Sequence, residues 1–320
     1  MVSGSTAPPK PKVGVSSCLL GNTVRYDGGH KNNRYITGTL GNYIDLVAWC
    51  PEAAAGFGTP RKPIRLTRIG ESSRVVEVGN PQKDVTDVLS AYARSQTGQM
   101  GDLAGFIFKK SSPSCGMERV KVYKQDGPPD PNGRGVFARE VMAAHPELPV
   151  EEEGRLQDSD LRSNFIGRVY TRHRWQQMCR SGLSPAALVA FHTQHKFFML
   201  AHNEAIYRRL GPLIAQVGTE NLAPTAGAYF SLLMEGLKTI ATPARHANVL
   251  MHILGFFKTQ LDARDKVELL DLIDQQRRGL LPLIVPHTLI NQYLRKFDVP
   301  YIAEQIYLAP TPSELLLLNS

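Results

Sequence analysis

The chain has little cysteine and no long apolar run, and both shortages exclude classes of protein. Its 320 residues include only four cysteines, too few for a disulfide scaffold at this length. No apolar run approaches the roughly 20 residues that a membrane-spanning helix needs. Residues 1–12 are small and polar and lack the apolar core of a secretory signal. We therefore expect a flexible tail over residues 1–11 and a cytoplasmic protein without a membrane partner.

A large excess of charge of either sign is also missing. The net charge of +8 divides evenly, with 20 − 16 = +4 over residues 1–155 and 17 − 13 = +4 over residues 156–320. This mild basic excess favours anionic partners such as nucleotides or RNA. It is equally typical of soluble proteins that bind no nucleic acid, so charge alone does not decide the partner. The length predicts two domains, each with its own core.

Residues 12–155 alternate short β-rich runs with helical stretches, which predicts an α/β domain. The candidate strands are residues 12–17, 44–49, 64–68, 74–78 and 105–109. Residues 84–100 predict a helix that Asp84 caps, and residues 135–145 predict another. Strands and helices in alternation favour one parallel sheet with flanking helices on both faces. A turn-rich segment over residues 127–133 is expected to be a loop.

Residues 156–320 have helical periodicity almost throughout and predict an all-α accessory bundle of about six helices. Ser184 and Thr242 each precede a proline, which is typical of a capped helix start. Cys179 lies beside Trp175 in this region, and we expect it to pack in the core.

The other three cysteines each follow a short apolar run that is typical of a strand. The pairs are residues 12–17 before Cys18, residues 44–49 before Cys50, and residues 105–109 before Cys115, the last through a short polar loop. If these runs are parallel strands of one sheet, the three thiols meet at its carboxyl edge, where open α/β sheets build binding sites. Three converging thiolates predict a metal or iron–sulfur centre with one open coordination position.

The spacing of these cysteines matches no compact metal motif. The separations are 50 − 18 = 32 and 115 − 50 = 65 residues, unlike those of zinc fingers or ferredoxins. Scattered cysteines are also typical of small buried side chains. Their polar neighbours favour a functional site instead: a glycine-rich loop follows Cys18, Glu52 lies two residues after Cys50, and a serine-rich turn precedes Cys115.

Three motifs around these cysteines carry a family resemblance. They are Val15-Ser-Ser-Cys-Leu-Leu-Gly21 with Val24-Arg-Tyr-Asp-Gly28, Trp49-Cys-Pro-Glu52, and Ser111-Ser-Pro-Ser-Cys-Gly116. Together they resemble the TudS thiouracil desulfidase family over roughly residues 12–155. The remainder, with the segments 192–202 and 246–258, resembles a helical domain found fused to that family, whose function is not established.

The resemblance implies a cofactor and a reaction. Cys18, Cys50 and Cys115 would hold a 4Fe–4S cluster whose fourth iron has no protein ligand and acts as a Lewis acid toward sulfur. The implied reaction removes sulfur from 4-thiouracil or 4-thio-UMP and gives uracil or UMP and hydrogen sulfide without redox change. This reaction would serve sulfur metabolism and the salvage of thiolated nucleotides.

Such a reaction needs a group that transfers protons near the attacked carbon. Glu52 is the first candidate because it lies two residues from a predicted ligand. Ser112, and after it Ser114, are candidates to position water or relay a proton, although Ser-Pro sequences also suit turns without catalysis.

A nucleotide substrate also needs a phosphate site, and the loop around Cys18 offers one. The predicted substrate-binding residues are Ser17, Arg25, Gly28, Gly29, His30 and Lys31. The glycines follow neither a Walker nor a Rossmann fingerprint. Arg61, Lys62 and Arg65 are further cationic candidates, each of which is also typical of a solvated surface charge.

The helical domain leaves several functions open. It carries histidines at positions 192, 195 and 202 near one helical face, which would suit a metal or a polar contact. A basic surface could also form there, from Arg172, Arg174, Arg208, Arg209, Arg277 and Arg278. If that surface binds tRNA, the substrate would be thiouridine within tRNA. Two further functions fit the same chain: a tRNA thiolation enzyme, and a non-enzymatic RNA-binding or sensor module that holds a cluster or zinc.

Overall fold

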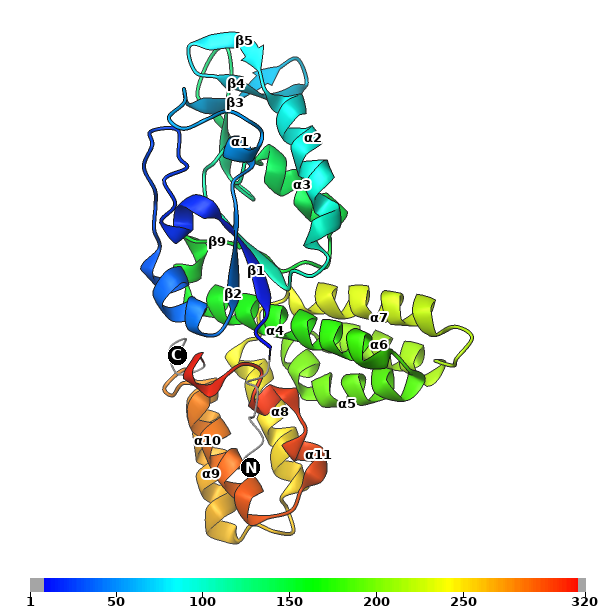
Figure 1. Cartoon of the computed structure of the whole chain (residues 1–320). Coiled ribbons are helices and arrows are strands. Elements are labelled where there is room, and N and C mark those ends of the chain that lie inside the picture. Colours follow the sequence, from blue (N-terminus) through cyan, green and yellow to red (C-terminus); the bar gives the residue numbers. More distant parts are fainter. Residues whose placement is uncertain (1–8, 316–320) are drawn as a thin grey trace, which may run out of the picture. The chain divides into compact units, whose positions relative to one another are not determined.

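The computed structural model describes residues 9–315, and the chain divides into two compact units, Met1–Asp158 and Ser159–Ser320. Most of the tail predicted over residues 1–11 lies outside the described residues. The first unit is α/β and the second is helical (Figure 1), so the predicted fold class is confirmed. No helix within residues 9–315 has the length and apolar character needed to cross a membrane.

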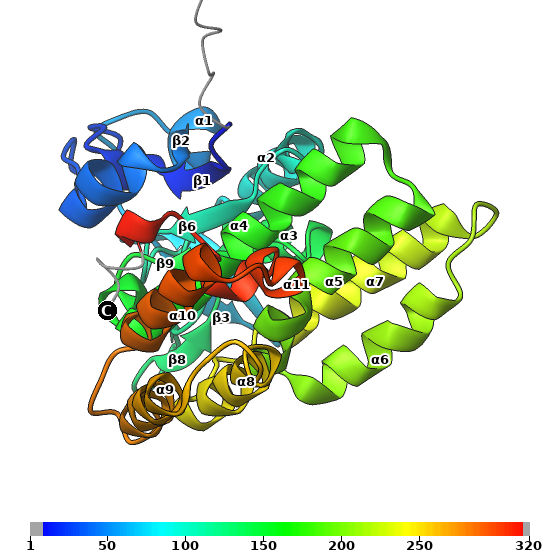
Figure 2. The ribbon, with the colours of Figure 1, turned by 90° about the horizontal axis from the view of Figure 1, so that it is seen from below.

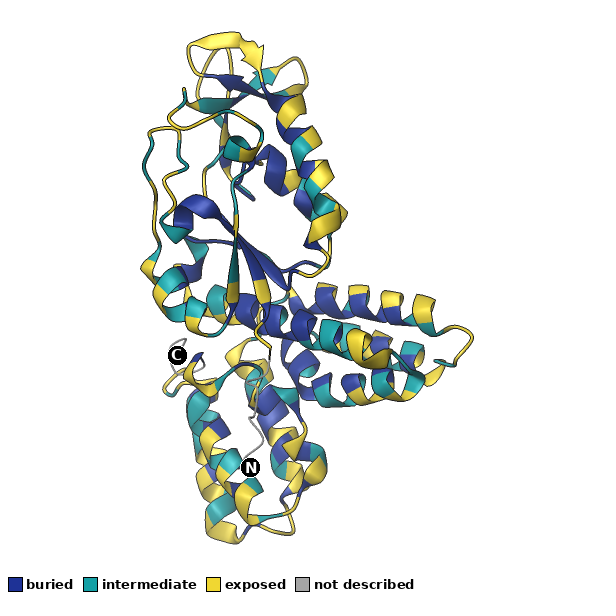
Figure 3. Ribbon diagram, in the orientation of Figure 1, coloured by how far each residue is buried: buried dark blue, intermediate teal, exposed yellow. Residues whose placement is uncertain are grey.

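Sheet A of the first unit is parallel throughout. Its strands in spatial order are β2 (Asp45–Trp49), β1 (Lys12–Ser16), β6 (Gly105–Phe108) and β9 (Val150–Glu152). The central strands β1 and β6 are almost entirely buried (Figure 3), which explains why they read as continuous apolar runs. In register, Ser16 lies beside Trp49 and Val15 beside Ile107, so the three strands that precede the cysteines end close together.

Two helices pack against one face of sheet A. These are α2 (Thr86–Thr97) and α3 (Val136–Ala144). Phe137 of α3 lies within 5.9 Å of Phe106 and 6.3 Å of Phe108, centroid to centroid, in a buried aromatic cluster. The prediction that Asp84 caps α2 is wrong, because Asp84 is the last residue of β5 and Val85 is the N-cap; the Asp84 carboxylate accepts instead from the backbone N–H of Thr86 at 2.8 Å. Short 3₁₀ helices lie at Leu40–Asn42, Gly98–Met100 and Arg155–Gln157, and a π-helical turn at Tyr35–Thr39 precedes the first of them.

The prediction of a single sheet is wrong, because the segments at residues 64–68 and 74–78 form part of a second one. The order of sheet B is β5 (Asn80–Asp84), β4 (Ser72–Glu77), β3 (Ile64–Ile69), β7 (Val120–Tyr123) and β8 (Asp130–Gly133). Only Gly70 and Glu71 connect β3 to β4, and a parallel crossover needs a dozen residues or more. The two strands are therefore antiparallel. The segment expected to be a loop, residues 127–133, supplies β8.

The second unit is built from helices that pack on one another. Its helices are α4 (Ser159–Gly182), α5 (Pro185–His202), α6 (Glu204–Ala215), α7 (Leu222–Leu237), α8 (Pro243–Phe256), α9 (Ala263–Arg277), α10 (Ile284–Lys296) and the short α11 (Pro300–Ala303), followed by a 3₁₀ turn at Ile306–Leu308. Within residues 159–315 this exceeds the six that the sequence predicts. Helices α5, α6 and α7 pack side by side (Figure 2), as do α8, α9 and α10.

The predicted caps of two of these helices are present. The Ser184 hydroxyl accepts from the N–H of Ala187 at 3.1 Å, and the Thr242 hydroxyl accepts from the N–H of Arg245 at 3.3 Å. The prediction for Cys179 is wrong, because this thiol is exposed. It begins the last turn of α4, residues 179–182, which is exposed throughout, whereas Trp175 one turn earlier is buried.

The predicted basic surface of the helical unit does not form as expected. Arg172 is buried, and Arg174 donates to the carbonyl of Pro310 at 2.7 Å, with a pKa that desolvation lowers to about 10. Arg208 pairs with Glu204 at 2.6 Å. Arg277 and Arg278 both pair with Asp274. Five of the six predicted arginines are therefore buried, bonded to backbone carbonyls or paired with acidic residues, whereas Arg209 is exposed.

Three buried histidines and the half-buried His246 make the stability of the helical unit sensitive to acid. Desolvation lowers the pKa of His195 and His246 to about 3 and that of His202 and His287 to about 4. The unfolded chain binds their protons near pH 6.5, so stability is complete above that pH and falls as the pH drops toward 4. Each histidine contributes up to about 1.4 kcal/mol per pH unit in this window. Urea unfolding between pH 7.5 and 4.5 measures it.

One variant isolates the contribution of a single histidine. His195→Asn is expected to remove about one proton from the pH dependence of the unfolding free energy. A slope equal to that of the unaltered chain would contradict the assignment.

Candidate active site

The three cysteines of the first unit line one pocket. Cys18 lies in a 3₁₀ helix (Ser17–Leu20) directly after β1, Cys50 directly follows β2, and Cys115 lies in the loop after β6. Because these three strands are parallel neighbours, their carboxyl ends meet at one edge of sheet A. The pocket at this edge has a volume of about 390 Å³, and all three cysteines are among its lining residues.

Burial works against ionisation of these thiols. Desolvation raises the pKa of Cys18 to about 11, and it also raises the pKa of Cys50 and, most strongly, that of Cys115. The neighbouring thiolates add to this effect, since Cys50 raises the pKa of Cys18, and both raise that of Cys115. Thiols this close, each less able to ionise because of the others, suit a cationic partner that stabilises the thiolate.

The loop before Cys115 is held by its own serines and by a glycine. The Ser112 hydroxyl accepts from the backbone N–H groups of Ser114 at 3.2 Å and Cys115 at 3.0 Å, which is turn chemistry. Gly135 packs against this turn so closely that a Cβ there would lie 2.5 Å from the carbonyl of Ser114. Ser112 also lines the pocket, so its structural role and its candidate catalytic role lie at the same place.

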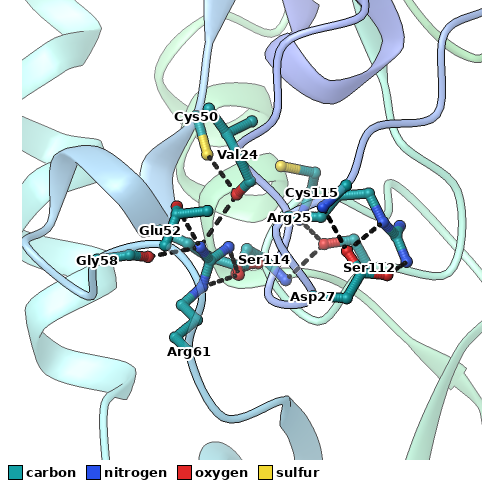
Figure 4. Close-up of polar contacts among 12 residues, drawn as sticks. Val24, Arg25, Asp27, Cys50, Glu52, Gly58, Arg61, Ser112, Ser114 and Cys115 are labelled. Atoms are coloured by element: carbon teal, nitrogen blue, oxygen red, sulfur yellow. Dashed lines mark hydrogen bonds and ion pairs between the residues drawn. The ribbon is translucent and has the colours of Figure 1, made fainter.

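Glu52 lies in the first turn of the short helix α1 (Pro51–Ala54), and two side chains hold its carboxylate in place (Figure 4). One carboxylate oxygen, Oε1, accepts from the hydroxyl of Ser114 at 2.8 Å. The other, Oε2, accepts from Arg61, with Nε at 3.0 Å and Nη2 closer still. Ser114 is fully buried and does not line the pocket itself. The structure therefore places it behind Glu52, where it orients the carboxylate.

Arg61 is the residue whose role the sequence did not indicate. It was a candidate for phosphate binding, but its guanidinium pairs with Glu52 and donates to the carbonyls of Val24 at 3.0 Å and Gly58 at 2.8 Å. These contacts tie the Cys18 loop, α1 and the following turn together. No local pattern predicts them, because they depend on where the chain returns after α1.

Loss of Arg61 is expected to destabilise the first unit. Arg61→Met leaves Glu52, whose side chain is 15% exposed, without its charged partner, and breaking such a buried pair costs about 3 kcal/mol. Urea unfolding of the whole chain measures this loss. The double variant Arg61→Met/Glu52→Gln removes both charges and should recover much of it. A double variant as unstable as the sum of the single changes would contradict a direct pair.

The pocket lining is predominantly cationic. Its charged residues are Arg25, Lys31, Glu52, Arg61, Lys109 and Lys110. Arg25 pairs with Asp27, and Lys109 pairs with Glu153. Among the described residues, no ion pair involves Lys31 or Lys110, and both are exposed. The two lysines thus supply uncompensated positive charge at the pocket, which favours an anionic group of a substrate.

The structure does not bring every predicted substrate-binding residue to the pocket. Ser17, Arg25 and Lys31 line it, whereas Gly28, Gly29 and His30 do not. The N–H of Gly28 donates to the carbonyl of Arg25 at 3.0 Å, and that of Gly29 donates to Asp27 at 3.0 Å. These amides already hold the turn and are not free to bind a phosphate.

Lys109, Lys110 and Trp49 line the pocket without having been predicted to bind substrate or cofactor. The two lysines directly precede the loop of Cys115, so their position in the sequence was a usable signal. The indole Nε1 of Trp49 is buried and has no hydrogen-bond partner. An unpaired buried N–H donor costs about 1–3 kcal/mol, and a hydrogen bond from this N–H to an acceptor would remove that cost.

The residues present fit an iron–sulfur cluster better than a single metal ion. Among residues 9–315, no three His, Cys, Asp or Glu side chains converge as the ligands of one ion. A cluster does not require this, because each cysteine binds its own iron. Cys18, Cys50 and Cys115 would be those ligands, and the orphaned N–H of Trp49 suits the sulfur of such a group.

Comparison with known proteins places the chain in a family. It is 32% identical over 154 residues to the uncharacterized protein YbgA of Escherichia coli (strain K12), which is 48% of this chain and 91% of YbgA. It is 33% identical over 110 residues to the uncharacterized protein YbbK of Bacillus subtilis (strain 168), or 32% of this chain and 71% of YbbK. Residues 13–153 match the family described as 2-thiouracil desulfurase. The chain belongs to the 2-thiouracil desulfurase family.

The match to the 2-thiouracil desulfurase family covers the residues that line the pocket but not the helical unit. Residues 196–312 match a family described as a protein of unknown function, DUF1722. Among solved structures, the chain is similar to one titled [4Fe-4S]-dependent thiouracil desulfidase TudS (DUF523Vcz). The two are 32% identical, with 46% of this chain and 94% of that chain covered and a TM-score of 0.38.

Proposed function

We propose that the chain is a desulfidase that converts 4-thiouracil or 4-thio-UMP and water into uracil or UMP and hydrogen sulfide. One observation carries this proposal: three thiols from three adjacent strands line one pocket together with a carboxylate whose orientation is fixed. Membership of the 2-thiouracil desulfurase family supports removal of sulfur from a thiolated pyrimidine. The reaction exchanges C=S for C=O, so water supplies both the oxygen and two protons and no electron donor is needed.

When bound at Cys18, Cys50 and Cys115, a 4Fe–4S cluster supplies a Lewis-acidic iron that polarises a thiocarbonyl sulfur. The chain supplies the proton transfer. Glu52 takes a proton from the attacking water and returns it to the departing sulfur, while Arg61 and Ser114 hold its two oxygens in place. Ser112 lies in the same pocket and is a second candidate to position the water.

The charge of the pocket favours the nucleotide over the free base. Among the cations that line the pocket, Lys31 and Lys110 are exposed and form no ion pair with the described residues, and a phosphate monoester would complement both. Their flexible stems place a positive charge at the pocket without a fixed bidentate geometry. We therefore expect a higher kcat/KM for 4-thio-UMP than for 4-thiouracil.

The test uses anaerobically purified protein whose cluster has been reconstituted. Iron and sulfide are measured first, followed by the loss of the long-wavelength absorbance of the thiopyrimidine and the release of hydrogen sulfide. The substrates compared are 4-thio-UMP, 4-thiouracil, 2-thiouracil and thiolated tRNA. Turnover of 4-thio-UMP with hydrogen sulfide release is the expected result. Turnover of thiolated tRNA alone would reassign the substrate, and a protein that binds zinc and turns over none of them would overturn the proposal.

A further inference from the structure

A second pocket, of about 380 Å³, lies within the helical unit and contains an unusual number of buried polar side chains. The polar residues that matter are Asn164, His202, His246, Gln276, His287 and Tyr307. They come from α4, α5, α8, α9, α10 and the 3₁₀ turn at Ile306–Leu308. Six segments of the unit thus contribute a polar group to one cavity, which a merely apolar core would not require.

Among these residues, Gln276 provides the strongest evidence for a ligand site. Its side chain is only 4% exposed, and its Oε1 atom is buried with no hydrogen-bond partner. Its Nε2 atom makes no hydrogen bond to the described residues either. A buried acceptor without a partner costs about 1–3 kcal/mol, and Oε1 is such an atom. Such a cost is expected where a ligand completes the hydrogen bonds, and a carboxamide offers an acceptor beside a donor.

His287 is a second residue of this cavity with a buried polar atom that lacks a hydrogen-bond partner. It is 3% exposed, and its Nε2 atom is buried without a partner. Two further imidazoles are oriented by contacts at Nδ1. That of His202 lies 2.7 Å from the carbonyl of Thr239 and that of His246 lies 3.0 Å from the hydroxyl of Tyr307. Because a carbonyl only accepts, Nδ1 of His202 carries the proton and its Nε2 is left as an acceptor.

The lining carries almost no charge. Asp160 is the one acidic residue among the described residues that line the cavity, and no lysine or arginine lines it. Burial lowers the pKa of His202, His246 and His287 far below neutrality, so the three imidazoles are uncharged at pH 7. An anionic ligand would find no countercharge in this lining. The cavity therefore favours an uncharged ligand.

The same residues do not favour a metal ion. Within residues 9–315, the histidines and acidic side chains form no group of three around one position. The aromatic side chains of Phe198 and Tyr307 line the cavity with proline and leucine side chains, and the ring of His287 lies 4.8 Å from that of Tyr307. Flat apolar surfaces beside isolated donors and acceptors are typical of sites for planar organic ligands.

We propose that this cavity binds a small uncharged heterocycle with an amide-type edge, a ring N–H beside a ring carbonyl, which pairs with the carboxamide of Gln276. His287 and His202 supply further hydrogen bonds to polar atoms of the same ring, and the aromatic walls contact its faces. A pyrimidine base is the simplest member of this class. The proposal does not depend on the proposed desulfidase function, because every residue that it uses lies in the other unit.

The experiment measures binding of uracil to the full-length protein by the ring signals of its histidines in NMR spectra of histidine-labelled chain. Uracil is expected to shift the signals of His202, His246 and His287. The probe 1,3-dimethyluracil is the matched control, because methylation removes both ring N–H groups. We expect it to bind at least about tenfold more weakly, in line with the loss of one or two hydrogen bonds.

Two variants assign the contact. Gln276→Met keeps the shape of the side chain and removes the unpaired amide, so it should fold and should lower uracil affinity at least about tenfold. Gln275→Met changes the neighbouring glutamine, which bonds Asp271 at 2.6 Å and does not line the cavity, and should bind uracil as the unaltered chain does. Unshifted signals of the three histidines, equal binding of the two probes, or undiminished binding by Gln276→Met would each overturn the proposal.

Discussion

Replacing Cys50 with alanine is expected to abolish desulfidation and to lower the iron bound after reconstitution well below about four per chain. Cys50 is the most accessible of the three cysteines of the pocket, and its thiol lies 4.0 Å from the carbonyl of Val24 and near the backbone N–H groups of Glu52 and Ala53. The substitution therefore removes a ligand with little loss of packing. Iron and sulfide content, visible absorbance and turnover of 4-thio-UMP are measured on the same sample.

The matched control for this prediction is Cys179→Ala. Cys179 is exposed and lies in α4 of the helical unit, so its removal should change neither iron content nor turnover. If Cys50→Ala kept full iron and full activity, the thiols of the pocket would not be the ligands. If it lost activity but kept its iron, Cys50 would act on the substrate rather than on the cluster.

Replacing Glu52 with glutamine is expected to lower kcat by about 10²–10⁴-fold, with KM and iron content nearly unchanged. The amide has the shape of the carboxylate, so its oxygen still accepts from Arg61 and its NH₂ donates to the hydroxyl of Ser114. What the variant loses is the ability to take and return a proton. Steady-state kinetics with 4-thio-UMP separate this effect from a loss of binding.

Glu77→Gln is the control for the loss of a buried, paired carboxylate. Glu77 pairs with Lys62 and Lys83 in the same unit, its side chain is 8% exposed, and it does not line the pocket. We expect this variant to keep its kcat. A Glu52→Gln enzyme with unchanged kcat would exclude Glu52 from proton transfer and leave Ser112 as the candidate.

The ends of the strands that precede the cysteines could be predicted from the sequence, whereas the hydrogen-bond and ion-pair partners of the site's side chains could not. Apolar runs that end at Cys18 and Cys50 indicate strands, and parallel strands bring their carboxyl ends to one edge. That rule fails for residues 64–78, where the two-residue turn at Gly70 was the signal against a parallel connection. The pairing of Arg61 with Glu52 had no such signal, since it depends on a turn after α1 rather than on spacing.

By itself, the sequence determined the two-part architecture, the set of three thiols and the family, because strand and helix periodicity and short motifs are local properties. Only the tertiary structure decided which groups face which. It placed Ser114 behind Glu52, turned Gly28 and Gly29 away from the pocket, exposed Cys179, and gathered His202, His287 and Gln276 around a second cavity. These outcomes depend on packing between segments far apart in the chain, where burial and hydrogen-bond satisfaction, rather than local pattern, set the position of a side chain.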